Sequence, residues 1–167
     1  MASELHVDAI KHSGGTSALT IDSSGRVTRS VLPAWRIGLS ANLDVSSTGT
    51  DVAWTNTSSN GRFIQGGCSA SSGIVTVPTA GIYQINTSCR VNNVSANYIE
   101  LYIKVNNSDD TYAYHIEGDP YSSYHTLSVS EIFSLSANDN VRIRLYPGSD
   151  SSWTLHQLSN FSGVMIG

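Results

Sequence analysis

Apolar and polar residues alternate along most of the chain with a period of two, which is typical of β-strands that bury one face. In the segment 97–106 the two faces carry Ile99, Leu101, Ile103 and Val105 and, opposite them, Tyr98, Glu100, Tyr102 and Lys104. In 81–91 one face carries Tyr83, Ile85, Thr87, Cys89 and Val91. No segment sustains the period of 3.6 that marks an amphipathic helix, so we expect an all-β protein.

Strand-length runs recur between turn-forming clusters, of which SASSG (69–73) and SANDN (136–140) are examples. The predicted strands are 34–40, 52–55, 62–65, 73–77, 81–91, 97–106, 111–116, 125–135, 140–146 and 159–166. Many short strands at this spacing indicate a sandwich or a barrel.

Residues 1–32 have a different character from the rest of the chain. They are polar, and the stretch 13–28 (SGGTSALTIDSSGRVT) predicts two short strands joined by glycine turns. The segment has too few apolar residues for a core of its own, so it needs a partner surface. We therefore expect a boundary near Pro33, with an anchoring or trimerising arm in 1–32 and the main domain in 33–167.

Charge and composition exclude several classes of function. Only 13% of the residues are charged, and the net charge is -4. Because no Lys/Arg cluster is present, nucleic acid is not an expected partner. No apolar run reaches the length needed to span a membrane, and Glu4 and Asp8 interrupt the apolar core that a signal peptide needs. Cys68 and Cys89 lack metal-binding spacing; whether they pair stays open.

Four segments, in the right order, resemble one known family. GIVTVPTAGIYQI (73–85), LSANDNVRIRL (135–145), NFSGVMIG (160–167) and PAWRIGLS (33–40) are similar to segments of the TNF-like jelly roll, in the version found in the globular heads of complement's first component. Asn138 stands where that family usually has Gly, and Asn160 replaces a Ser.

The resemblance implies a ten-stranded antiparallel jelly-roll sandwich that forms a homotrimer with one sheet facing the threefold axis. We expect the core or the trimer contact to include Trp35, Tyr83, Glu131, Phe133 and Phe161. Eight tyrosines and few lysines also favour a buried interface, because interface cores are rich in Tyr and poor in Lys. Residues 20–35 (TIDSSGRVTRSVLPAW) resemble junctions that precede such domains in phage tail-fibre and virion proteins.

Motifs of catalysis are missing from the sequence: it has no HExxH, no GxSxG and no phosphate-binding loop. We therefore expect no enzyme and no catalytic residue. Aromatic side chains with polar tips are instead concentrated in 111–125, and such groups bind sugar and protein surfaces. The candidate ligand-binding residues are Tyr112, Tyr114, His115, Tyr121, Tyr124 and His125. The alternative, that half of them fill the sandwich, stays open.

Acidic turns in the same region suggest calcium as the one possible cofactor, since calcium prefers oxygen ligands. The candidate ligands are Asp109, Asp110, Glu117 and Asp119. These residue types are also ordinary turn formers. Glu131 shares a strand face with apolar residues, and unpaired charges are almost never buried. It either pairs across the trimer with an arginine such as Arg90 or lies at a bulge that turns it outward.

Taken together, these features predict a non-enzymatic bacteriophage virion protein, a homotrimer displayed on the particle surface after assembly in the host cytoplasm. It would be a capsid decoration, a head fibre or a tail-fibre tip. Residues 1–32 would bind other virion proteins, and the domain would contribute to binding a host glycan or protein. The alternative is a secreted complement-like lectin or signalling ligand. A cupin-like enzyme is disfavoured because the histidines are not clustered.

Overall fold

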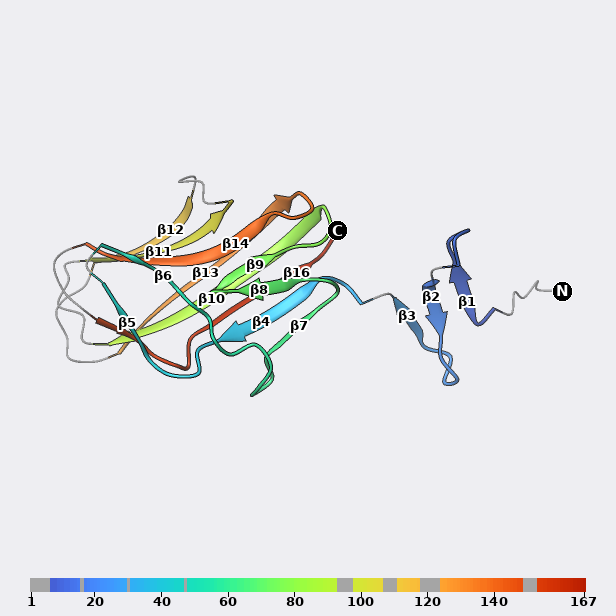
Figure 1. Ribbon diagram of the computed structural model, residues 1–167, viewed down its shortest axis with the longest axis horizontal. Helices are drawn as coiled ribbons and strands as arrows, with labels where there is room; N and C mark the ends of the chain where they lie inside the picture. Colours follow the sequence, from blue (N-terminus) through green and yellow to red (C-terminus); the bar gives the residue numbers. More distant parts are fainter. Residues whose placement is uncertain are drawn as a thin grey trace. The chain divides into compact units, whose positions relative to one another are not determined.

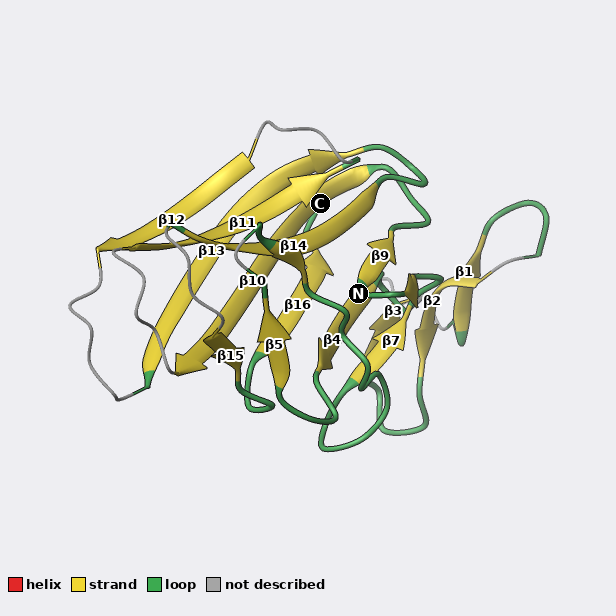
Figure 2. Ribbon diagram, turned by 60° about the vertical axis from the view of Figure 1, so that its left-hand side comes forward, coloured by secondary structure: helices red, strands yellow, loops and turns green. Residues whose placement is uncertain are grey.

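The computed structural model describes residues 7–15, 17–29, 31–46, 48–92, 98–106, 111–117, 124–148 and 153–167, with the backbone only for 28–29 and 111–117. All regular elements in these residues are β-strands, which confirms the predicted all-β class (Figures 1 and 2). No described segment forms a helix long and apolar enough to cross a membrane. The chain divides into two compact units, Met1–Leu32 and Pro33–Gly167.

The first unit is a three-stranded antiparallel sheet in the order β1-β2-β3. Its strands are β1 (Ala9–Lys11), β2 (Ser17–Ile21) and β3 (Val27–Arg29). Asp22 holds the turn before β3, because its Oδ1 accepts the backbone N–H groups of Ser24 and Arg26 at 2.9 and 3.0 Å. Ile10 and Val27 are 52% and 61% exposed, so this small sheet buries little apolar surface within itself. β1 was not among the predicted strands.

The second unit consists of two antiparallel sheets packed face to face. The larger sheet contains β4 (Ala34–Gly38), β5 (Leu43–Val45), β7 (Phe63–Gln65), β10 (Gly81–Asn92), β13 (His125–Leu135), β15 (Trp153–Leu155) and β16 (Asn160–Met165). The smaller sheet contains β6 (Thr50–Asp51), β8 (Ser69–Ser71), β9 (Ile74–Thr76), β11 (Tyr98–Val105), β12 (Thr111–Glu117) and β14 (Asn140–Pro147).

The long strand β10 organises the larger sheet. One of its edges pairs with β13 from Gly81 to Val91 without a register shift. Its other edge pairs with β16 over residues 83–88 and with β15 at residues 91–92. The order along this sheet is β5-β15-β10-β16-β4-β7, and the smaller sheet runs β12-β11-β14-β9-β8 (Figures 1 and 2).

Side chains from the facing sides of the two sheets fill the core. The predicted inward faces of β10 and β14 are confirmed, and so is that of β11 up to Ile103; at its end Lys104 is buried and Val105 only partly buried. Trp35, Tyr83 and Phe161 are fully buried, and Phe133 is 9% exposed. The Trp35 and Phe161 rings meet edge to face at 5.6 Å, a favourable geometry for aromatic pairs.

Two predictions about individual segments were wrong. Residues 69–71 of the cluster predicted as a turn form β8, because pairing with β9 overrides the weak strand propensity of Ser, while Ser72 and Gly73 do form the turn. The strand predicted at 52–55 lies earlier, at β6, while Val52 and Trp54 are buried outside any strand. Asn138 adopts a φ of 72°, the left-handed conformation that explains how it replaces the usual Gly.

The proposed bulge at Glu131 is also wrong. The β10–β13 register is continuous and places Glu131 opposite Ile85, on the inward-facing side of β13. β13 is the edge strand of its sheet, so Glu131 is only half-buried. An edge position therefore accommodates this charge without a bulge, and the predicted pairing with Arg90 of a neighbouring subunit stays a prediction.

Replacing Gly163 tests the packing of the core. A β-carbon at this position would lie 2.3 Å from the Trp35 ring, so Gly163→Ala must displace a fully buried tryptophan. We expect the free energy of unfolding to fall by about 1–3 kcal/mol. Denaturant titration measures this change. Ser162→Ala, on the outward face of the same strand, should change it by less than about 0.5 kcal/mol; equal effects would contradict this packing.

Candidate functional site

Residues 111–117 of the predicted ligand-binding segment form β12, the edge strand of the smaller sheet. β12 pairs with β11 along its whole length. Thr111 lies opposite Lys104 at one end, and Glu117 lies opposite Tyr98 at the other. Tyr112, Tyr114 and His115 are on β12, but the description of this strand is limited to its backbone, and Tyr121 lies outside the described residues. A shared binding role for these residues stays a prediction.

The calcium prediction falls largely outside the described part of the chain. Asp109, Asp110 and Asp119 are not described, and Glu117 is the last residue of β12, with only its backbone described. Among the described residues, no group of three His, Cys, Asp or Glu side chains is close enough to hold a metal ion. Calcium binding stays a prediction.

Tyr124 lies in a small aromatic and cationic cluster just before β13. The Arg90 guanidinium carbon is 3.8 Å from the centre of the Tyr124 ring, a cation–π contact. The His156 ring meets the same tyrosine edge-on at 5.5 Å. His125, the next residue, has a buried Nε2 atom without a hydrogen-bond partner. Sequence reasoning did not group Arg90 and His156 with Tyr124, because strand pairing joins segments far apart in the chain.

Arg90 is the one charged residue among the outward-facing side chains of β10 and β13 in the larger sheet. Outward residues of β10 and β13 form a ladder of short polar side chains: the Ser130 hydroxyl donates to Asn86 Oδ1 at 2.6 Å, and the Ser128 hydroxyl donates to Ser88 Oγ at 3.2 Å. Near the start of β10, Ile82 and Ile132 are 38% and 60% exposed. Here exposed apolar side chains lie next to polar side chains that already hydrogen-bond to one another. Such a surface suits contact with another protein better than contact with water.

The outer face of the smaller sheet has the opposite character. Asp51 forms ion pairs with Arg144 at 2.9 Å and with Arg142 at 3.5 Å. The Tyr102 hydroxyl donates to Glu100 on the same strand. Partial burial and the neighbouring carboxylate raise the pKa of Tyr102 to about 12. On this face Asp51 pairs with both Arg142 and Arg144, so the outer face of the larger sheet is the better candidate for an interaction surface.

The two cysteines do not form a disulfide. Cys89 is fully buried on β10, where its sulfur lies 3.6 Å from the Thr87 hydroxyl. Burial raises the pKa of the Cys89 thiol to about 12. Burial also raises the pKa of Cys68, which is only partly buried beside the core.

Comparison with known proteins identifies the fold. No protein-family model and no curated protein matches the sequence. Among solved structures, the crystal structure of murine APRIL at pH 8.0 matches with a TM-score of 0.58 and 15% sequence identity, over 81% of this chain and 100% of that one. The chain has a TNF-like jelly-roll fold. The predicted fold is thereby confirmed, and a match at this identity carries no evidence about ligands.

Thiol labelling tests the state of the cysteines. At pH 8 we expect a disulfide reagent to modify Cys68 in the folded protein and Cys89 only after unfolding, because the thiolate is the reactive form and Cys89 is fully buried. Absorbance of the released thiol, with and without denaturant, measures how many cysteines react in the unfolded and in the folded protein. A denatured protein without reactive thiols, or a native one in which both react at once, would contradict this arrangement.

Proposed function

We propose that the chain is a non-enzymatic homotrimeric binding module displayed on the surface of a bacteriophage particle. The outer face of the larger sheet carries the proposal: it combines exposed Ile82 and Ile132 with uncharged, mutually hydrogen-bonded side chains. In an oligomer with closed rotational symmetry, a neighbouring copy of the same chain covers this face on every subunit. A stable contact of this kind buries about 800 Å² per partner.

Residues 1–32 support the placement on a particle. They form a separate small sheet that leaves Ile10 and Val27 largely exposed, so the sheet needs a partner to cover them. The stretch 20–35 also resembles junctions of phage tail-fibre and virion proteins. Many trimers on one particle would bind a host surface by avidity, even where each site is weak.

A free signalling ligand or complement-like lectin is the second candidate function. The TNF-like fold, which murine APRIL shares, suits a ligand as well as a structural trimer. Both candidates are trimers that bind a partner, so the trimer does not discriminate between them. Protein identification in purified phage particles does: a virion protein is present in stoichiometric amount, whereas a free ligand is absent.

We expect light scattering at micromolar concentration to give a mass of about 54 kDa, which corresponds to three copies of the 17.9-kDa chain. Ile82→Asp combined with Ile132→Asp places unpaired charges in the contact and should yield folded monomers, because burying an unpaired charge is costly. Ile74→Asp, on the smaller sheet, should leave the trimer intact. A wild-type mass near 18 kDa, or a double variant that remains trimeric, would contradict the proposed interface.

Deletion of residues 1–32 tests the anchoring role. The remaining chain should stay a folded trimer, because the core cluster consists entirely of residues in 33–167. It should no longer attach to particles, which co-sedimentation with particles lacking the protein would measure, with the full chain as the positive control. A truncated chain that still attaches would place the anchor in the jelly roll.

A further inference from the structure

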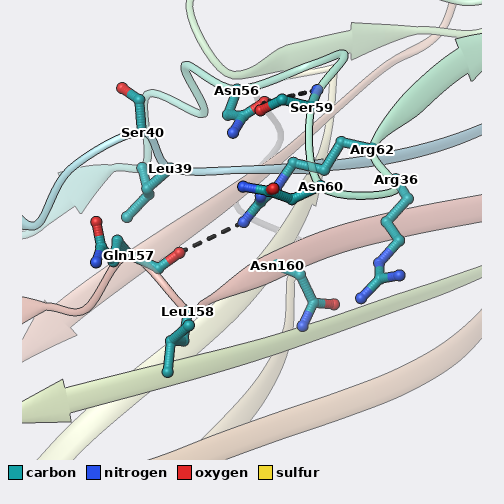
Figure 3. Close-up of a pocket in the computed structure, with 10 residues that line it drawn as sticks. All are labelled: Arg36, Leu39, Ser40, Asn56, Ser59, Asn60, Arg62, Gln157, Leu158 and Asn160. Atoms are coloured by element: carbon teal, nitrogen blue, oxygen red, sulfur yellow. Dashed lines mark hydrogen bonds between the residues drawn. The ribbon is translucent and has the colours of Figure 1, made fainter.

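A polar pocket of about 570 Å³ opens at one end of the larger sheet (Figure 3). It lies where β4 ends, between the loop 56–62 and the turn that precedes β16. The lining residues are Arg36, Leu39, Ser40, Asn56, Ser59, Asn60, Arg62, Gln157, Leu158 and Asn160. Two of them are arginines and none is acidic, so the pocket presents an unbalanced positive charge.

Arg62 is held in place by its surroundings. Its guanidinium lies against the backbone of Gly38, where a β-carbon would come within 2.2 Å of Nε. Its Nη2 donates to the Gln157 carbonyl at 3.4 Å, as the dashed line in Figure 3 shows. This single long bond leaves most of the five guanidinium N–H donors for a ligand.

Arg36 provides the second cationic group. It points outward from β4, next to Phe63 and Ser162 on the neighbouring strands. No described acidic side chain forms an ion pair with it. A guanidinium without a carboxylate partner is suited to bind a carboxylate through two parallel hydrogen bonds.

The walls of the pocket are fixed by local hydrogen bonds. Asn56 Oδ1 accepts the backbone N–H of Ser59 at 3.2 Å and its hydroxyl at 2.8 Å, which closes the loop. On the other side of the pocket, the backbone N–H of Gln157 donates to Asn42 Oδ1 at 3.0 Å, which holds the turn before β16. Such a preformed site loses little conformational entropy when a ligand binds.

The remaining lining groups select the kind of anion. The side-chain amides of Asn60, Gln157 and Asn160 both donate and accept hydrogen bonds, as the hydroxyl groups of a sugar require. Leu158 is 63% exposed and offers an apolar surface for the C–H face of a sugar ring. The volume also exceeds what an inorganic anion fills and falls in the range of small-molecule sites.

We infer that this pocket binds a sugar that carries a carboxylate. The arginines hold the carboxylate, the amides bind hydroxyl groups, and Leu158 contacts the ring. All ten lining residues belong to one subunit, so the inference does not require the homotrimer. Asn160 pairs with Ser88, six residues along β10 from Ile82, so the pocket adjoins the Ser88 end of the proposed contact.

Titration of the full chain with defined sugars, followed by NMR or calorimetry, tests this inference. The probes are N-acetylneuraminic acid and glucuronic acid, compared with neutral N-acetylglucosamine and glucose and with acetate and inorganic phosphate. We expect at least one acidic sugar to bind about tenfold or more tightly than both its neutral counterpart and either free anion. No binding of either acidic sugar at about 10 mM, or equal binding of neutral sugars or of phosphate, would overturn the inference.

Matched variants locate the site. Arg62→Met should weaken binding of the acidic sugar about tenfold, and Gly38→Ala should do so without a change in charge, because it displaces the Arg62 guanidinium. Arg26→Met removes the same charge in residues 1–32 and should leave the affinity unchanged. Each variant is first checked for native melting behaviour. Equal affinities for Arg62→Met and Arg26→Met would overturn the assignment, even if the trimer forms as proposed.

Discussion

The unbroken pairing of β10 with β13 is the constraint on which the rest of the structure depends. Eleven consecutive residue pairs, from Gly81 to Val91, fix which side chains of both strands face inward. A slip of one residue would move Tyr83, Ile85 and Cys89 from the core to the surface and expose several large apolar groups. Burying each such side chain contributes about 1.5–3 kcal/mol, so this register is strongly specified.

The same register determines the chemistry of the outer face. Once the apolar residues point inward, the alternate positions bring Asn86, Ser88, Ser128 and Ser130 together as a hydrogen-bonded ladder. Because Glu131 falls on the inward-facing side at a sheet edge, it does not interrupt this ladder. The outer face of the smaller sheet instead pairs Asp51 with two arginines. One sandwich thus presents one face suited to water and one suited to another protein surface.

Most of the fold could be predicted because its long strands carry their own signal. Period-two alternation marks β10, β11, β13 and β14, and each is close to its predicted range. Of the three-residue strands in the second unit, β7 and β9 were predicted, but β5, β8 and β15 were not. β15 exists because it pairs with the end of β10 at Val91 and Asn92, and β5 exists because it pairs with β15. Such strands depend on tertiary neighbours more than on local propensity.

The candidate sites were harder to predict, because each is assembled from distant segments. Tyr124 was named from its aromatic character, but its partners Arg90 and His156 join it only through strand pairing. The pocket similarly combines Arg36, the loop around Arg62 and the turn at Gln157. No local spacing connects these residues, and the glycine that accommodates Arg62 has no marker in the sequence.

Side-chain footprinting in solution tests most directly whether the outer face of the larger sheet is covered by sister subunits. In the isolated subunit, Ile132 and Leu158 have nearly equal exposure, 60% and 63%, so hydroxyl radicals would oxidise them at similar rates. We expect the native protein to protect Ile132 strongly while Leu158 stays reactive. Equal oxidation of both residues at working concentration would contradict it.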